Sequence, residues 1–386
     1  MRILLVHNFY RSQAIGGEDV AFNKEKEALE NQLGKENVLI YSDTSDRVNF
    51  LTVFLNVFFS FRHFWGVYRS VKKNSIQLVH CHNFFPLISF SIFLAARLAG
   101  AKTVVTLHNY RLWCSTGIFF RNNQICHDCI GKSFGLPSVI HGCYHDSRSQ
   151  SLITAIAFFL YRNVIGFSVI DKVVLLSEFQ KSLLIDSKLL SEHKIIVKPH
   201  FIEVNTEHRP THQIKEFDIV FIGKLEEAKG VYRLIEYIDR MGPECKWLII
   251  GDGPLRNKIE ELKYENVLYI KRLENAEVLS YIRKSRYLIQ LSLMYETFGL
   301  TILEAMSVGV PVIAFPIGTR KELVLHGENG FLLKGDEVRV LENALKIETQ
   351  DYELLSQNCL AFSDNFNLKK MIKLQVDFYK ELLSTT

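Results

Sequence analysis

Two glutamates separated by seven residues are the first candidates for chemistry in this sequence. Glu296 and Glu304 lie in the stretch YETFGLTILEAMSVGVPVIAF, residues 295–315. The run from 300 to 308 has the apolar spacing of a helix, and Gly309 before a proline is typical of a helix end. Glu304 is therefore expected on a helix and Glu296 in the loop before it, where the two carboxylates hold hydroxyl groups of one ligand. The alternative is that both are ordinary surface acids.

Two lysines have the context of a phosphate site. In FIGKLEEAKG a strand-like run ends at Gly223, Lys224 and Lys229 follow, and Gly230 precedes a helical segment. The N-terminus of a helix offers free N–H donors and a partial positive charge, so two ammonium groups beside it favour a diphosphate ligand. The alternative is a pair of solvated lysines in a loop.

The elements that must position these residues alternate along the chain. Apolar, β-branched runs recur with helical segments between them, at 3–7, 37–41, 76–80, 102–108, 171–177, 217–223, 246–253, 267–270, 287–292 and 311–315. Continuous apolar strands separated by helices predict parallel sheets covered on both faces. The expected fold class is α/β, with two Rossmann-like doubly wound domains facing a cleft. Ligands of such sheets bind at the carboxyl ends of the strands.

A polar stretch divides the two sets of strands. Residues 198–216 contain two prolines and lack periodicity, which is typical of a linker. We predict an N-terminal domain over residues 1–204 and a second domain over residues 205–364. A last helix, within residues 365–386, is expected to pack back towards the N-terminal domain.

Charge and hydropathy exclude several classes of protein. The 386 residues carry a formal charge of only +4, too little for a nucleic-acid-binding protein with a clustered basic surface. The first residues lack the order of a signal peptide, so a cytoplasmic protein is expected. The apolar segments at 50–71 and 152–167 contain interspersed basic residues. They fit either buried helices or peripheral contact with the cytoplasmic leaflet of a membrane.

Four of the seven cysteines fall close together. Cys126 and Cys129 have the C-x2-C spacing with which two thiolates bind one zinc ion, and Cys114 and Cys143 complete a candidate structural site. The second C-x2-C of a zinc ribbon is absent. A redox pair and buried thiols without a metal are the alternatives.

Several of these stretches resemble one enzyme family. The stretch 295–315 resembles the signature of retaining glycosyltransferases of family 4, which has a Glu-x7-Glu pair. GKLEEAKG is similar to the diphosphate motif of that family, with Lys224 where arginine is usual. GGED, residues 16–19, resembles its N-terminal Gly-Gly loop, although the acid here follows Gly17 directly. VHCHNFFPLIS and TLHNYRLWC resemble segments found especially in enzymes of bacterial surface-polysaccharide synthesis.

The resemblance implies a GT-B fold and transfer of a sugar from a nucleotide sugar to a glycan or lipid-linked acceptor, with retention at the anomeric carbon. The second domain would bind the donor and the first would lie on the acceptor side. Carried over by position, the donor-binding set would be Gly16, Gly17, Lys224, Lys229, Phe298, Gly299 and Glu304, and the catalytic set Glu296, His108 and Lys229.

The roles within these sets also follow from the resemblance. Lys224 and Lys229 would contact the diphosphate, Glu304 the ribose hydroxyls and Glu296 the transferred sugar. His108 would lie near the sugar and the β-phosphate.

The chain lacks an Asp-x-Asp pair, the usual carboxylate ligands of a metal-bound diphosphate. We therefore predict catalysis that requires no metal cofactor. Two alternatives remain open, a nucleotide-sugar epimerase on the same fold and a non-catalytic nucleotide-sugar-binding protein. A nicotinamide oxidoreductase would need a G-x-G-x-x-G turn after a strand, and neither GGED nor GDGP supplies it.

Overall fold

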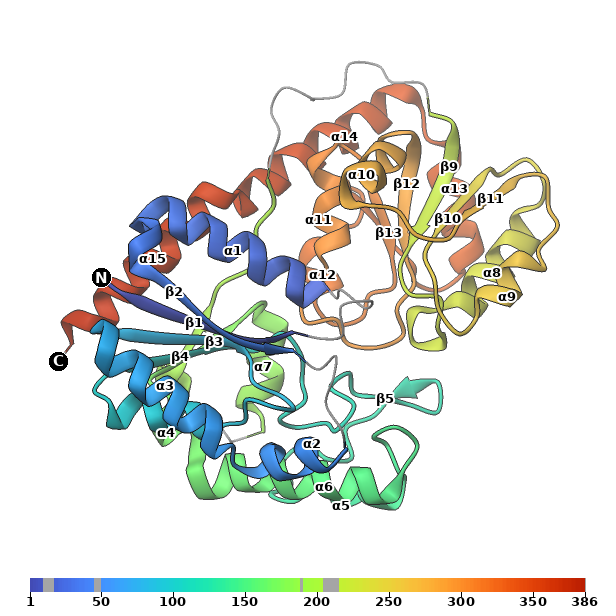
Figure 1. Ribbon diagram of the computed structural model, residues 1–386. Coiled ribbons are helices and arrows are strands. Elements are labelled where there is room, and N and C mark those ends of the chain that lie inside the picture. Colours follow the sequence, from blue (N-terminus) through green and yellow to red (C-terminus); the bar gives the residue numbers. More distant parts are fainter. Residues whose placement is uncertain (10–16, 45–49, 188–189, 204–214, 386) are drawn as a thin grey trace. The chain divides into compact units, whose positions relative to one another are not determined.

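The computed structural model describes residues 1–9, 17–44, 50–187, 190–203 and 215–385, without the side chains of residues 50 and 51. Its chain forms two compact units. The first comprises Met1–Phe119, His127–His200 and Lys369–Thr386, and the second Phe120–Cys126 and Phe201–Leu368. Each unit contains its own six-stranded sheet (Figure 1).

The first sheet is parallel throughout, with the strand order β2-β1-β3-β4-β7-β8. Its strands are β1 (Ile3–Phe9), β2 (Val38–Thr44), β3 (Leu78–Asn83), β4 (Lys102–Thr106), β7 (Lys172–Leu175) and β8 (Ile195–Val197). Strands β1, β3 and β4 are buried almost throughout, as expected for a sheet covered on both faces. The chain reverses its winding direction between β1 and β3. The carboxyl ends of these strands are therefore where a ligand of the first unit is expected.

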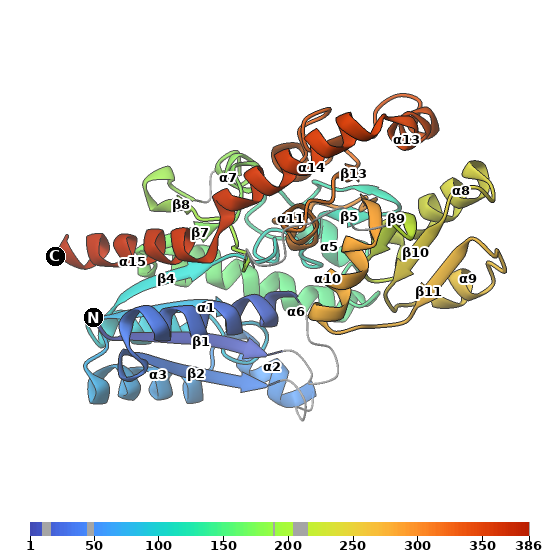
Figure 2. The same cartoon turned by 90° about the horizontal axis from the view of Figure 1, so that it is seen from above.

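The helices of the first unit lie on both faces of this sheet. Helices α1 and α15 lie against one face, and α3 and α4 against the other (Figures 1 and 2). The set comprises α1 (Gly17–Leu33), α2 (Phe50–Phe58), α3 (Phe61–Asn74), α4 (Ser91–Leu98), α5 (Leu136–Ile140), α6 (Arg148–Phe159), α7 (Glu178–Ile185) and α15 (Leu368–Ser384). Two of them begin at a serine cap: Ser147 accepts a hydrogen bond from Gln150 N before α6, and Ser177 from Gln180 N before α7.

The second sheet is also parallel, with the order β11-β10-β9-β12-β13-β14. Its strands are β9 (Phe217–Ile222), β10 (Trp247–Ile250), β11 (Val267–Ile270), β12 (Ser285–Gln290), β13 (Val312–Ala314) and β14 (Gly330–Leu332). Five of the six coincide with strand-like runs of the sequence, whereas β14 was not expected. A short antiparallel hairpin, β5 (Phe120–Arg121) and β6 (Gln124–Ile125), is separate from both large sheets.

Seven helices accompany the described part of this second sheet, namely α8 (Val231–Met241), α9 (Arg256–Glu260), α10 (Asn275–Arg283), α11 (Leu300–Ser307), α12 (Arg320–Leu323), α13 (Glu337–Lys346) and α14 (Thr349–Ser363). Helix α8 contacts α13, whereas α11 contacts α10 and α14. The core between the sheet and the α8 layer includes Trp247 and Tyr287, both fully buried. The winding direction reverses between β9 and β12, so a ligand of this unit is expected at their carboxyl ends.

Helix α11 ends as its sequence predicts. Gly309 has a φ of 71°, which favours glycine. Its N–H bonds to the carbonyl of Met306, and the N–H of Val310 bonds to the carbonyl of Ala305. These two bonds form a Schellman motif, which places the C-terminal end of α11 next to the start of β13.

Candidate functional site

The candidate site of the second unit is built on the loops that follow β9 and β12. These loops pack tightly on each other: the N–H of Leu293 donates to the carbonyl of Ala228. Gly230 has a φ of 79°, and a Cβ there would lie 2.1 Å from the carbonyl oxygen of Leu291. Only glycine therefore fits at the start of α8, and the close approach fixes Lys229 relative to the β12 loop.

An ion pair joins the two loops. The Nζ atom of Lys229 lies 2.7 Å from Oε1 of Glu296, and the hydroxyl of Ser292 donates to the same oxygen at 2.7 Å. The two charged side chains are only 21% and 17% exposed. The structure thus brings together two residues that the sequence analysis placed in one site but did not pair with each other.

Opposing effects act on the Glu296 carboxyl. Burial alone would raise the pKa of Glu296, but the charge of Lys229 and the hydrogen bonds from Lys229 and Ser292 lower it to about 2. Arg320 adds to this lowering of the pKa. Glu296 is therefore ionised at neutral pH, which makes it an acceptor of hydrogen bonds and a stabiliser of positive charge rather than a general acid.

Thr319 and Arg320 support the Glu296 loop, and the sequence analysis did not identify either. The Thr319 hydroxyl donates to the backbone carbonyl of Glu296 at 3.0 Å. Arg320 is fully buried, and its guanidinium donates to the carbonyls of Phe315 and Ser292. In the sequence, Arg320 appears only as one arginine of the stretch GTRKELV, residues 318–324. Nothing in its spacing showed that the side chain turns inward.

The remaining predicted residues of this unit differ in their surroundings. Gly299 precedes α11 with a φ of 132°, so glycine suits this entry into the helix. Phe298 is buried, and its ring packs against Phe366 with centroids 5.9 Å apart. Glu304 is partly buried within α11. Lys224 is 60% exposed and forms an ion pair with Glu226.

In the first unit, the predicted residue His108 follows β4 and belongs to a cluster of buried histidines. Its Nε2 atom lies 3.0 Å from Nδ1 of His82, and its ring stacks on His200 with centroids 5.2 Å apart. Burial lowers the pKa of His108 well below its usual range, and the neighbouring His200 and His82 add to this effect. A small pocket within this unit is lined by His82 and His108 together with Asn83, Phe85, Thr106, Asn109 and Arg111. His108 is thus a neutral side chain at the wall of a pocket.

The glycine pair of the first unit is only partly described. Gly17 is the exposed first residue of α1, while Gly16 lies outside the described residues. Two acids, Glu18 and Asp19, follow these glycines. Asp19 is buried, and its Oδ1 lies 2.7 Å from Nε2 of the buried His7.

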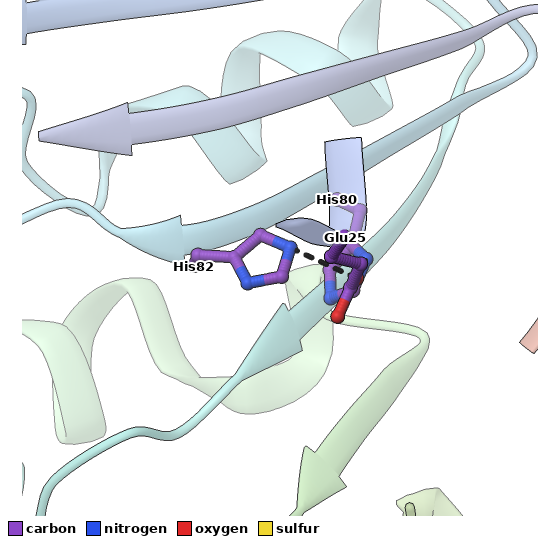
Figure 3. Close-up of side chains that lie close together, drawn as sticks. All are labelled: Glu25, His80 and His82. Carbon is purple, nitrogen blue, oxygen red and sulfur yellow. Dashed lines mark ion pairs between the residues drawn. The ribbon is translucent and has the colours of Figure 1, made fainter. Parts of the chain in front are cut away.

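A buried polar cluster that includes His82 was not predicted from the sequence. Glu25 of α1 lies 2.9 Å from the ammonium of Lys198. It lies 3.2 Å from Nε2 of His82, a contact that Figure 3 marks with a dashed line. Gln375 of α15 donates to Oε1, the oxygen that also faces His82, whereas Lys198 contacts Oε2. Burial alone would raise the pKa of Glu25, yet Lys198 and His82 hold it well below its usual range. The members are far apart in sequence and share no motif, so no local pattern could have revealed them.

The cysteine quartet remains a prediction. All seven cysteines are thiols; Cys114, Cys126, Cys129 and Cys143 are partly exposed, whereas Cys81, Cys245 and Cys359 are buried.

Comparisons with known proteins agree with this architecture. Residues 204–373 match the family model described as glycosyl transferases group 1. An uncharacterized glycosyltransferase of Methanocaldococcus jannaschii is 26% identical over 319 residues, which cover 81% of this chain and 77% of the relative. The UDP-Gal:alpha-D-GlcNAc-diphosphoundecaprenol alpha-1,3-galactosyltransferase of Escherichia coli is 25% identical over 331 residues, covering 82% and 79%.

A solved structure shares the fold along the whole chain. The crystal structure of HepE from Anabaena in complex with UDP has a TM-score of 0.68 at 17% identity and covers 99% of this chain and 100% of its own. Residues 204–373 thus match the glycosyl transferases group 1 family, and these matches together support a glycosyltransferase of the GT-B fold.

Proposed function

We propose that this glycosyltransferase moves a sugar, with retention at the anomeric carbon, from a nucleotide sugar to a glycan or lipid-linked acceptor in surface-polysaccharide synthesis. The observation that carries the proposal is the Lys229–Glu296 ion pair at the carboxyl ends of β9 and β12. Support for the acceptor class comes from the Escherichia coli relative, whose name specifies a diphosphoundecaprenol-linked sugar. No observation favours an epimerase or a non-catalytic sugar-nucleotide-binding protein.

The two charges of this pair suit the two charges that develop in glycosyl transfer. Positive charge builds up at the anomeric carbon while negative charge builds up on the leaving diphosphate. In this proposal the ammonium of Lys229 stabilises the diphosphate. The Glu296 carboxylate stabilises the oxocarbenium-like sugar, and it remains ionised because its pKa is about 2. Ser292 and Thr319 hold Glu296 in place from its side chain and its backbone.

The other donor contacts in the proposal follow the family resemblance. Lys224, exposed in the loop after β9, is the second cation for the diphosphate. Glu304 on α11 binds the ribose hydroxyls, and Phe298 and Gly299 present backbone N–H groups at the start of that helix. In the first unit, Gly16, Gly17 and His108 are the proposed donor contacts.

We also propose that the protein is cytoplasmic and touches the membrane surface through α2 and α3. Leu55, Phe61 and Trp65 are exposed apolar side chains on these helices, and Phe61 is 71% exposed. Arg62, 81% exposed, adds positive charge beside them. Apolar side chains flanked by basic ones suit an anionic leaflet. Helix α6 continues through a π-helical and a 3-10 turn to Val169, and this stretch, Arg148–Val169, is the one helical segment among the described residues that is long and apolar enough to cross a membrane.

The membrane contact is tested by sedimentation with anionic and with neutral phospholipid vesicles. We expect binding to the anionic vesicles that falls on replacement of Phe61 and Trp65 by serine, because the buried apolar area is lost. The matched control is Leu268→Ser in the second unit, which also removes an exposed apolar side chain. Equal binding by wild type and by the Phe61/Trp65 double variant would contradict the contact.

Kinetics of three variants test the proposed roles, using a donor that the wild type hydrolyses or transfers from a panel of nucleotide sugars. Lys229→Ala should lower the rate about 100-fold or more and weaken donor binding, because it removes a fixed charge at the leaving group. Glu304→Ala should mainly raise the donor KM, since ribose contacts change little in the transition state. Glu296→Ala should lower kcat more than it raises KM.

Lys258→Ala provides a control for the loss of a positive charge from the same unit, because Lys258 is an exposed lysine of α9. It should leave both constants unchanged. Turnover of Glu296→Ala at the wild-type rate would show that the ion pair is not part of the catalytic machinery.

Metal dependence gives a separate test. We propose that transfer needs no divalent cation, because Lys224 and Lys229 neutralise the diphosphate, and that zinc bound by Cys114, Cys126, Cys129 and Cys143 is structural. Activity should therefore survive EDTA under conditions that leave a thiolate-bound zinc in place. Elemental analysis should find about one zinc per chain, and less in Cys129→Ser. A strict requirement for added magnesium or manganese would contradict the first expectation, and absence of zinc the second.

A further inference from the structure

The buried cluster of the first unit contains a directed chain of polar contacts that ends at His108. It runs from Glu25 on α1 to His82 on β3 and then to His108 after β4. Oε1 of Glu25 lies 3.2 Å from Nε2 of His82, and Nδ1 of His82 lies 3.0 Å from Nε2 of His108. Figure 3 marks the contact between Glu25 and His82 with a dashed line.

This series of polar contacts starts at the carboxylate of Glu25, which is ionised. Lys198 places its ammonium 2.9 Å from Oε2 of Glu25, and the amide of Gln375 donates to Oε1. A lone pair on Nε2 of His82 would face the lone pairs of the Glu25 carboxylate at 3.2 Å. We therefore expect the proton on Nε2, where it is attracted to the carboxylate without a well-aligned hydrogen bond.

The charge of the cluster determines the next step. Glu25 and Lys198 are both 3% exposed and neutralise each other, so a cationic His82 would leave a net buried charge. Such a charge costs far more than a neutral imidazole. A neutral His82 protonated at Nε2 has a lone pair on Nδ1, and this lone pair can only accept a hydrogen bond from Nε2–H of His108. His108 then has its own lone pair on Nδ1.

We propose that Glu25 and His82 are positioning residues that hold His108 as the neutral Nε2–H tautomer. This inference rests on the role of His108 in the proposed function. A histidine in this state accepts a hydrogen bond at Nδ1 from a hydroxyl group and cannot donate one there to a phosphate oxygen. The orientation and proton position of an imidazole are set in this way by the group behind it in other histidine-dependent sites.

The same cluster is less suited to a metal ion. Glu25, His80 and His82 each offer a ligand atom, all within 4.8 Å of one another. However, Lys198 already supplies the positive charge at Glu25. His80 is engaged on both ring nitrogens, by Tyr379 at Nδ1 and by Thr106 at Nε2. A cation would have to displace these partners and overcome the repulsion of a buried ammonium.

His80 provides a matched control for His82. Both are buried histidines of β3, and their ring centroids lie 4.4 Å apart. His80 bonds to Tyr379 and Thr106, whereas His82 bonds to His108. Replacement of either ring by phenylalanine removes buried polar atoms, but only His82→Phe removes the acceptor for His108.

The test is long-range proton–nitrogen NMR of 15N-histidine-labelled protein at pH 7, which distinguishes the two neutral tautomers and the cation. The His108 signals are assigned by their loss in His108→Gln. We expect His108 to be the Nε2–H tautomer in the wild type and in His80→Phe, and a mixture of tautomers in His82→Phe. Observation of the Nδ1–H tautomer or the cation in the wild type would overturn the proposal, and so would an unchanged His108 tautomer in His82→Phe.

Kinetics separate this proposal from the proposed function. His82→Phe should lower kcat roughly 10- to 100-fold, by analogy with the loss of a group that orients a metal-bound histidine, with little change in donor KM. His80→Phe should lower kcat less. If the tautomers are as expected but His108→Gln transfers sugar at the wild-type rate, the role of His108 in the proposed function is wrong, while the tautomer assignment stands.

Discussion

The ion pair between Lys229 and Glu296 is the interaction on which the second unit's site depends. A carboxylate that is only 17% exposed is unfavourable without a counter-charge, and Lys229 supplies it at 2.7 Å. That distance requires the loops after β9 and β12 to touch, which the absence of a side chain at Gly230 permits. The pair is thus a structural feature of the free protein. In the proposed reaction the two residues have different roles. The ammonium of Lys229 stabilises the diphosphate, and the carboxylate of Glu296 stabilises the sugar.

The first unit also contains a buried carboxylate that needs a counter-charge, but its partners are different. Its buried carboxylate, Glu25, is neutralised by Lys198 and also contacts Gln375, which belongs to the last helix of the chain. The cluster therefore ties α15 and the end of β8 to α1. Both units stabilise an ionised glutamate near the carboxyl ends of central parallel strands, where α/β sheets bind ligands. Only Glu296 lies next to predicted donor residues, whereas Glu25 reaches His108 through His82.

The sequence predicted the elements better than the contacts between them. Apolar runs predicted ten of the twelve strands of the two large sheets to within a few residues and missed the short edge strands β8 and β14. Gly309 marked the end of α11, because such an end depends on local backbone conformation. The family resemblance placed Lys229 and Glu296 in one site. Arg320 and Glu25 were missed for a physical reason. Their partners are backbone carbonyls or residues up to 350 positions away, and no local pattern records such contacts.

The most direct test of the central ion pair is the pKa of the Glu296 side chain, measured by NMR of protein labelled with 13C at the glutamate carboxyl carbons. With a pKa of about 2, the wild-type carboxylate should show no titration between about pH 5 and 8. Lys229→Met removes the main counter-charge while burial remains, so the pKa of Glu296 should rise in that variant. A wild-type Glu296 that titrates between about pH 5 and 8, or a pKa that Lys229→Met leaves unchanged, would contradict the account.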